Sequence, residues 1–254
     1  MPPSVFMGDR SIIVCRDAEE LNQKAAEQFV ALANEPSASS GRFAVALSGG
    51  STPRTLYSLL ATPGFADRIP WPKVHLFWGD ERCVPPDHPD SNYRMVRESL
   101  LSKISIPSEN VHRMAGEKDP KLAAAEYEEQ LIKFFRLSKG ETPRFDLILL
   151  GLGEDGHTAS LFPESDALNE MQRLVATTYL PKLNAHRLTL TLPVLNESAE
   201  IYFLVAGKNK AAIVKELLGI QPTIAKFPAQ RIQPVDGALT WFITRDAAAE
   251  LPTR

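Results

Sequence analysis

The sequence of 254 residues lacks the features that mark several specialised classes of protein. Its two cysteines, Cys15 and Cys83, lie far apart and show no metal-ligand spacing. This pattern argues against a disulfide scaffold and a zinc site, and it fits a reducing compartment. No apolar run approaches the roughly 20 residues needed to span a bilayer. The N-terminal residues MPPSVFMGDR contain no basic segment followed by an apolar run. We therefore expect no signal peptide, no membrane partner and a cytoplasmic location.

Strong charge of either sign is also missing. The chain has 28 basic and 31 acidic residues, a formal net charge of −3, so it has no broad electrostatic footprint for nucleic acid. Any anionic ligand must then be held by a local cluster of groups. The sequence shows no internal repeat, no low-complexity tract and no convincing linker, and we expect residues 1–254 to form a single domain.

What the sequence does contain is an alternation of short apolar strands with amphipathic helices. Asp17 is expected to cap the first helix, with Glu20 completing a capping box, and residues 35–41 form a polar loop. Residues 187–192 (RLTLTL) alternate strictly, which indicates a half-exposed or antiparallel strand. The alternation predicts an α/β fold with a mostly parallel, open, doubly wound Rossmann-like sheet and helices on both faces. The expected strands cover residues 11–15, 43–47, 74–78, 111–114, 145–150, a segment near 175, 187–192, 200–205 and 238–244, and the expected helices cover residues 17–34, 53–60, 91–101, 120–135, 209–218 and 247–251.

Four polar or glycine-rich loops follow four of these strands. Their sequences are SGGSTP (residues 48–53), GDER (79–82), GLGEDGH (151–157) and AGKNK (206–210). Ligands of open α/β sheets bind beyond the carboxyl ends of the strands. We therefore expect these four loops to meet at one edge of the sheet and to form the functional site.

The first loop has the chemistry of an anion site. Its residues Ser48, Gly49, Gly50, Ser51 and Thr52 offer successive backbone N–H groups and hydroxyls at the start of a helix. It lacks the lysine of a Walker A loop, so it suits a phosphate monoester better than a nucleoside triphosphate. The alternative is a glycine turn in which Ser51 or Thr52 is a plain N-cap.

Lys208, in the fourth loop, could supply the countercharge for that anion. A cation is poorly placed at a helix N-terminus unless an anion is bound there. The alternative is a solvated lysine at the start of a helix.

The third loop matches the dinucleotide pattern G-x-G-x-x-G, but its surroundings do not fit. Pro163 ends the following segment about two turns after Gly156, and Glu154 and Asp155 would repel a pyrophosphate. The loop presents His157 instead, and imidazole is a suitable base near neutral pH. We expect His157 to be catalytic, with Asp155 or Glu154 orienting it. The alternative is a histidine that only caps the short segment after Gly156.

The second loop places Asp80 and Arg82 on either side of Glu81. An Asp-x-Arg pair at a strand end can contact a polar ligand, although an exposed structural ion pair is the plainer alternative. Arg187, which opens RLTLTL, is a further candidate for ligand binding or an ordinary surface charge. Residues 87–90 (DHPD) resemble a metal site in composition but fit a proline-held surface loop, and we expect no metal. Ser160 follows His157 closely, but without a G-x-S-x-G elbow a covalent mechanism is not favoured.

These motifs resemble those of the family that comprises 6-phosphogluconolactonases and glucosamine-6-phosphate isomerases/deaminases. The lactonase branch resembles the chain most, because its pattern GxGxDGHxASLFP fits residues 151–163 and its GDER fits residues 79–82. The isomerase branch typically has A-F-N-E-P after D-G-H and Asp-Glu-Tyr where Asp80 to Arg82 stand here. The resembling segments are Ala46–Tyr57, Trp78–Tyr93, Phe145–Pro163, Arg187–Asn196, Phe203–Ala211 and Pro228–Thr244.

The resemblance implies hydrolysis of 6-phospho-D-glucono-1,5-lactone to 6-phospho-D-gluconate, without a cofactor. It implies a sugar-phosphate lactone as the small-molecule partner, in a monomer or weak homo-oligomer. In the mechanism we expect, His157 activates water, Asp155 orients His157, Arg82 stabilises the oxyanion and Asp80 positions Arg82 or a sugar hydroxyl. Phosphate is bound by residues 48–52 and Lys208, with Arg187. Alternatives are an amino-sugar-phosphate isomerase/deaminase, a non-catalytic sugar-phosphate sensor and a dinucleotide-binding oxidoreductase.

Overall fold

The computed structural model describes residues 10–35, 41–219 and 226–252. Residues 1–9 of the N-terminal segment discussed above and residues 36–40 of the polar loop lie outside these ranges. Seven strands form the main sheet, in the order β1-β10-β9-β6-β2-β3-β5, and every pairing within it is parallel. The strands of this sheet are β1 (Arg10–Cys15), β2 (Phe43–Leu47), β3 (Val74–Trp78), β5 (Val111–His112), β6 (Leu147–Leu150), β9 (Glu200–Val205) and β10 (Ala238–Thr244).

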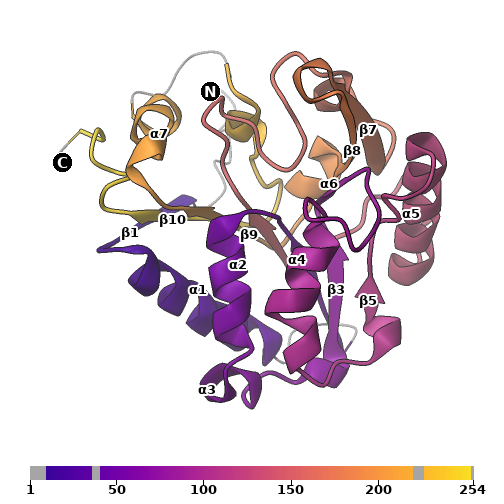
Figure 1. Cartoon of the computed structure of the whole chain (residues 1–254), viewed down its shortest axis with the longest axis horizontal. Coiled ribbons are helices and arrows are strands. Elements are labelled where there is room, and N and C mark those ends of the chain that lie inside the picture. The colour runs from indigo at the N-terminus through magenta and orange to yellow at the C-terminus, as the bar shows by residue number, and fades with distance from the viewer. Residues whose placement is uncertain (1–9, 36–40, 220–225, 253–254) are drawn as a thin grey trace, which may run out of the picture.

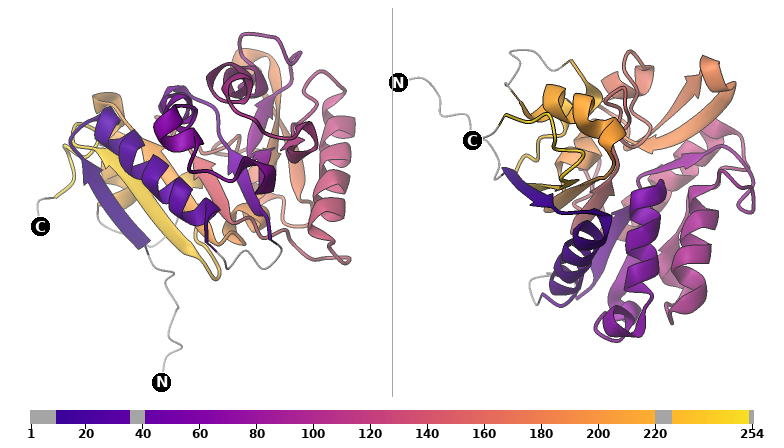
Figure 2. Two further views of the ribbon diagram at one scale, coloured as in Figure 1. Left: turned by 90° about the horizontal axis from the view of Figure 1, so that it is seen from below. Right: turned by 60° about the vertical axis from the view of Figure 1, so that its left-hand side comes forward.

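Helices connect these strands and cover the sheet. Parallel neighbours require right-handed crossovers, and the strand order therefore places α1, α2 and α4 on one face and α5 and α7 on the other. Figures 1 and 2 show α1 and α2 side by side, with α5 at the opposite side of the molecule from α1. The helices are α1 (Ala18–Ala33), α2 (Ser51–Leu60), α3 (Pro63–Ala66), α4 (Asn92–Ser99), α5 (Pro120–Phe135), α6 (Leu192–Asn196) and α7 (Ala211–Leu218). The mostly parallel, doubly wound α/β fold expected from the sequence is confirmed.

The central strands are apolar because they are covered on both sides. Every residue of β2 and of β6 is buried, as is usual for strands inside a parallel sheet. The chain leaves β2 toward β3 in one direction of the sheet and leaves β6 toward β9 in the other. Since β2 and β6 are neighbours, their carboxyl ends form the point where the strand order reverses, which is where ligands of open sheets bind.

A second, smaller sheet has the order β4-β8-β7 and is antiparallel throughout. It consists of β4 (Asp80–Arg82), β7 (Val175–Leu180) and β8 (Ala185–Leu190). The antiparallel pairing expected for RLTLTL is confirmed. The expectation that GDER is a loop was wrong, since Asp80, Glu81 and Arg82 pair with β8 as a short strand.

Three local expectations were also wrong. Asp17 caps α1 by accepting from Glu20 N, but the Glu20 carboxylate bonds the backbone and side chain of Arg16 instead of closing a capping box. Residues 247–251 form turns, not a helix. The strict alternation of RLTLTL is not mirrored in burial, because the last three residues of β8 are all buried where it meets the core.

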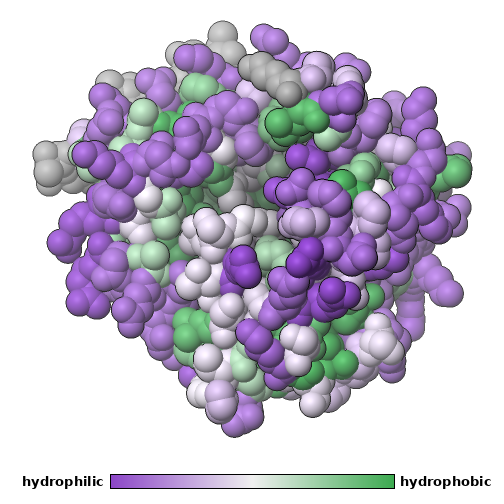
Figure 3. Space-filling model, viewed as in Figure 1, coloured by the Kyte–Doolittle hydropathy of each residue, from purple (hydrophilic) through white to green (hydrophobic). Residues whose placement is uncertain are grey.

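The surface seen in Figure 3 is mostly hydrophilic, with hydrophobic residues in small separate groups. Within residues 10–35, 41–219 and 226–252, no helix has the length and apolar character required to cross a bilayer.

Candidate active site

A polar cavity of about 380 Å³ lies beyond the carboxyl ends of β2, β6 and β9. All four loops singled out in the sequence reach it. The lining includes Ser48 to Thr52, Asp80, Arg82, His157, Asn209 and Lys210. The cavity therefore combines a glycine-rich backbone, one carboxylate, one imidazole and two cationic side chains.

The loop after β2 is shaped by Tyr57 and by Gly50. The buried Tyr57 hydroxyl accepts from Ser48 N at 3.0 Å and donates to Ser48 O at 2.9 Å, which fixes the backbone where the strand ends. Gly50 has φ 104°, a conformation that favours glycine. The Ser48 hydroxyl is buried without a hydrogen-bond partner among the described residues. Helix α2 begins at Ser51, so its first N–H groups face the loop region and favour an anion.

His157 is joined to Asp155 in the turn after β6. His157 Nδ1 lies 2.5 Å from Asp155 Oδ1, and the His157 backbone N–H donates to the same oxygen at 3.2 Å. An ionised carboxylate only accepts, so Nδ1 carries the proton and Nε2 is left as the basic nitrogen. Burial alone would raise the pKa of Asp155, but the hydrogen bonds and charge of His157 outweigh it and lower that pKa. Asp155 therefore stays ionised and keeps the imidazole in one tautomer.

The same turn is packed from several sides. A Cβ on Gly153 would overlap the His157 ring, and a Cβ on Gly156 would overlap Phe227. The ring of Phe162 lies 4.2 Å from that of His157, centroid to centroid. No helix follows Gly156; residues 157–163 form turns around a bridge between Thr158 and Leu161. Capping of a helix by His157 is thereby excluded.

The two acids of the turn have different partners. Glu154 Oε1 accepts from Asn209 Nδ2 at 2.6 Å, which links the turn after β6 to the segment after β9. Asp155 alone contacts His157. The sequence left open which acid orients the histidine, and the geometry favours Asp155.

Asp80 is buried at the cavity wall and is held by residues from two other segments. Its Oδ2 accepts from Ser160 Oγ at 2.8 Å, and its Oδ1 accepts from Asn92 Nδ2 at 3.3 Å. No hydrogen bond or ion pair joins Asp80 to Arg82 in the part of the chain that the structure describes. The Arg82 Nη1 group donates instead to Asp90 O at 2.8 Å.

Arg187 lies directly opposite Arg82 across the β4–β8 pair. Like charges at such a position repel each other. Burial, followed by the charge of Arg82, lowers the pKa of the Arg187 guanidinium. Arg187 does not line the cavity, but the opposed arginines raise the positive potential at this corner, which suits an anion.

The lysine that reaches the cavity is Lys210. Lys208 is exposed and does not line it, whereas Lys210 does. Residues 208–210 form a 3-10 turn before α7, and this turn directs the two lysines differently. No signal in the sequence distinguishes them, because both follow the same strand.

Of the residues expected at the site, Ser48 to Thr52, Asp80, Arg82 and His157 meet at the cavity, and Asp155 contacts His157 from behind it. Arg187 and Lys208 stand outside it. Asn209, Lys210 and Thr158 are lining residues that sequence reasoning missed. Across the described ranges, no three His, Cys, Asp or Glu side chains are grouped to hold a metal ion.

Comparisons with known proteins agree on one family. The family model described as "Glucosamine-6-phosphate isomerases/6-phosphogluconolactonase" matches residues 16–241. A 6-phosphogluconolactonase of Nostoc sp. is 44% identical over 212 residues, 83% of this chain and 85% of that protein. A 6-phosphogluconolactonase of Synechocystis sp. is 45% identical over 212 residues, which are likewise 83% of this chain and 85% of that protein. The structure of 6-phosphogluconolactonase from Trypanosoma cruzi superposes with a TM-score of 0.85 at 30% identity, covering 99% of this chain and 100% of that chain.

Proposed function

The chain belongs to the family of glucosamine-6-phosphate isomerases and 6-phosphogluconolactonases, and on that premise we propose that it hydrolyses 6-phospho-D-glucono-1,5-lactone to 6-phospho-D-gluconate. This reaction is the second step of the oxidative pentose phosphate pathway. The observation that carries the proposal is the His157–Asp155 pair, which stands at a cavity that also holds an anion-binding loop and two cations.

Phosphate is bound by residues 48–52 together with Lys210. The start of α2 offers backbone N–H groups, the Ser48 hydroxyl is free to bond a ligand, and Lys210 adds a charge-assisted hydrogen bond. Lys210 takes the place that the sequence assigned to Lys208. Binding of a remote phosphate positions the reacting carbonyl without taking part in the chemistry.

His157 acts as the general base. Its Nε2 takes a proton from water while the water oxygen attacks the lactone carbonyl carbon, and the carbonyl oxygen becomes an oxyanion. The oxyanion re-forms the carbonyl as the C1–O5 bond breaks, the ring oxygen leaves with the electron pair of that bond, and the imidazolium gives its proton to the ring oxygen. The carboxylic acid so formed then loses a proton to solvent and becomes the carboxylate. One water molecule is consumed and no net charge is left on His157.

Arg82 stabilises the oxyanion, and Arg187 supports it with positive potential from behind. Asp80 accepts a hydrogen bond from a hydroxyl of the sugar, because each of its carboxylate oxygens keeps a lone pair after accepting from Ser160 or Asn92. The kinetics of Arg82→Ala test this division of roles. A fall in kcat fits the oxyanion role, whereas a higher KM with unchanged kcat would reassign Arg82 to the phosphate.

The reaction itself is tested by following proton release from freshly generated 6-phosphogluconolactone, with spontaneous hydrolysis subtracted. Enzyme-dependent acceleration is expected. Ammonia release from glucosamine 6-phosphate would instead favour the isomerase/deaminase branch, and phosphate-dependent thermal stabilisation without turnover would favour a non-catalytic sensor.

Three further properties belong to this proposal. We propose a single domain over residues 1–254, which is supported by one continuous hydrophobic core among the described residues. A cytoplasmic location and a monomer or weak homo-oligomer are proposed from the sequence. Sedimentation velocity would test the oligomeric state.

A further inference from the structure

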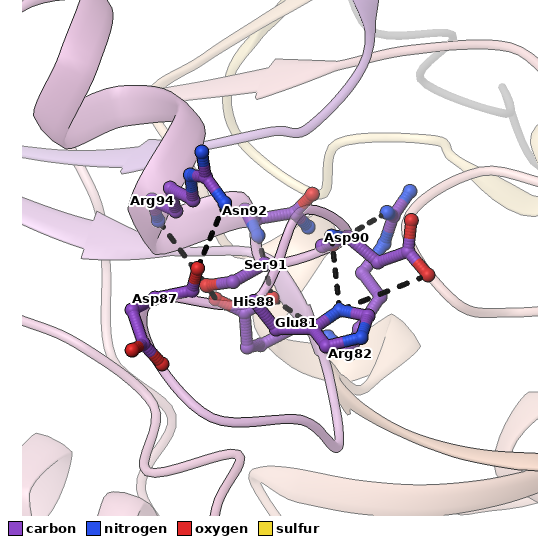
Figure 4. Close-up of polar contacts among 8 residues, drawn as sticks. All are labelled: Glu81, Arg82, Asp87, His88, Asp90, Ser91, Asn92 and Arg94. Atoms are coloured by element: carbon purple, nitrogen blue, oxygen red, sulfur yellow. Dashed lines mark hydrogen bonds and ion pairs between the residues drawn. The ribbon is translucent and has the colours of Figure 1, made fainter.

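Glu81 is a buried carboxylate that the mechanism does not use. It lies on β4 between Asp80 and Arg82, and only 2% of it is exposed. Side chains alternate along a strand, so Glu81 points away from the face that carries its two neighbours. Figure 4 shows it beside Ser91 and Asn92, where the loop from β4 reaches the start of α4. Because burying a charge is unfavourable unless it is well bonded, its partners are informative.

Four donors surround this carboxylate. Oε1 accepts from the backbone N–H groups of Arg82 and Asn92, each at 2.7 Å. Oε2 accepts from Tyr93 N at 2.8 Å and from Ser91 Oγ at 3.2 Å. Burial raises the pKa of Glu81, and these backbone bonds oppose that rise.

Capping the N-terminus of α4 does not require Glu81. Helix α4 already has its own N-cap, because Ser91 Oγ accepts from Arg94 N at 3.1 Å. A second acceptor from a distant strand therefore ties the start of α4 to β4, where Asp80 and Arg82 face the cavity.

The residues that Glu81 holds are in turn bonded to the cavity wall. Asn92 Nδ2 donates to Asp80 O at 3.0 Å as well as to its carboxylate, and a Cβ on Gly49 would overlap the Asn92 side chain. The returning loop presents Asp90 O, which accepts from Arg82 Nη1. Displacement of the α4 start would thus disturb Asp80, Arg82 and the anion loop together.

We propose that Glu81 is a positioning residue that holds the Arg82 guanidinium and the Asp80 carboxylate in place through the start of α4. This inference rests on the proposed function. The competing role is purely structural, in which Glu81 only adds stability. The two roles differ in whether the effect of Glu81 depends on Arg82.

A double-mutant cycle separates them. Glu81→Gln keeps the shape but turns an NH₂ group or a weaker acceptor toward the donors. It is expected to lower kcat/KM about 10–100-fold in the wild type, and by a clearly smaller factor in the Arg82→Ala background, where only the disturbance of Asp80 and the anion loop remains. The matched control is Glu128→Gln, since Glu128 also accepts backbone N–H groups, from Leu174 and Val175, away from the cavity. It should lower the melting temperature and leave kcat/KM within about 3-fold.

Equal losses from Glu81→Gln in both backgrounds, or losses that only match those of Glu128→Gln, would overturn the inference. Should Glu81→Gln not fold, Glu81→Asp replaces it in the cycle, with the charge kept and the reach shortened. The same cycle is measured on the Kd for 6-phosphogluconate by calorimetry. If the wild type binds 6-phosphogluconate but does not hydrolyse the lactone, the proposed function is wrong, and the cycle on Kd still tests the role of Glu81. If the wild type neither binds 6-phosphogluconate nor hydrolyses the lactone, both proposals are overturned.

Discussion

The imidazole of His157 is hydrogen-bonded through Nδ1 to Asp155, at 2.5 Å. This contact fixes which nitrogen is protonated and leaves Nε2 to act on water. It is the local geometry from which the proposed hydrolysis follows, and it separates Asp155 from its neighbour Glu154.

Asp155→Asn should lower kcat about 10–10³-fold with KM little changed, because an amide no longer favours the reactive tautomer or stabilises the imidazolium. Glu154→Gln is the matched control. Since Glu154 bonds Asn209 and not His157, its kcat should change less than about 3-fold. Steady-state kinetics on the lactone measure both, and equal effects of the two substitutions would remove Asp155 from the role.

Gly153→Ala should impair catalysis, because the added Cβ would overlap the His157 ring. Displacing a base by about 1 Å can lower the rate by about 10²-fold. Gly64→Ala on α3 is the control, as its Cβ meets nothing within 4 Å. Initial rates, with melting temperatures recorded alongside, would show the difference, and unchanged turnover in Gly153→Ala would contradict the packing described for the turn.

Lys210→Ala should weaken substrate binding more than Lys208→Ala does. Loss of a hydrogen bond to a charged group corresponds to about a 10–100-fold rise in KM, whereas Lys208 is exposed and outside the cavity. Measurement of KM for both variants, or of Kd for 6-phosphogluconate, decides between them. The larger effect at Lys208 would return the phosphate contact to the residue that the sequence favoured.

Acid should destabilise the fold through His75 and His112. His75 Nδ1 lies 3.2 Å from His112 Nε2. Burial lowers the pKa of both histidines, that of His112 to about 4. The charge of His75 adds to the lowering at His112. Between about pH 6.5 and about pH 4 the unfolded chain binds more protons than the folded one, so stability falls as pH falls through that range.

His112→Phe tests this effect, because it keeps an aromatic ring stacked on Phe77 and removes the titrating group. The urea midpoint of the wild type should drop between about pH 7 and about pH 4.5, and that of the variant should drop less. Carboxylates titrate in both proteins and cancel in the comparison. Parallel curves for the two would contradict the assignment.

The sequence predicted the framework because its signals are local. Residues 43–47 and 147–150 are continuous apolar runs, and such runs indicate strands buried inside a parallel sheet. The loops that follow the parallel strands sit at the strand ends by topology alone, so the sequence is sufficient to predict that His157, Asp80 and Arg82 lie at one edge of the sheet. The lactonase pattern over residues 151–163 identified the family.

What the sequence missed depends on contacts between distant segments. Glu81 was assigned to a loop, since only its pairing with β8 makes it part of a strand. Lys208 and Lys210 are two residues apart in a single 3-10 turn and point in different directions. No spacing rule specifies which of them reaches the cavity. The expected helix at residues 247–251 does not form, because so few residues make too few helical hydrogen bonds to offset the cost of starting a helix.

The proposed hydrolysis depends above all on His157 as the base that activates water. His157→Asn is measured beside the wild type by proton release from freshly generated 6-phosphogluconolactone, with spontaneous hydrolysis subtracted and melting temperatures compared. A folded variant whose kcat falls at least about 10²-fold is the predicted result. Turnover within about 3-fold of the wild type would contradict the account and leave the cavity without its base.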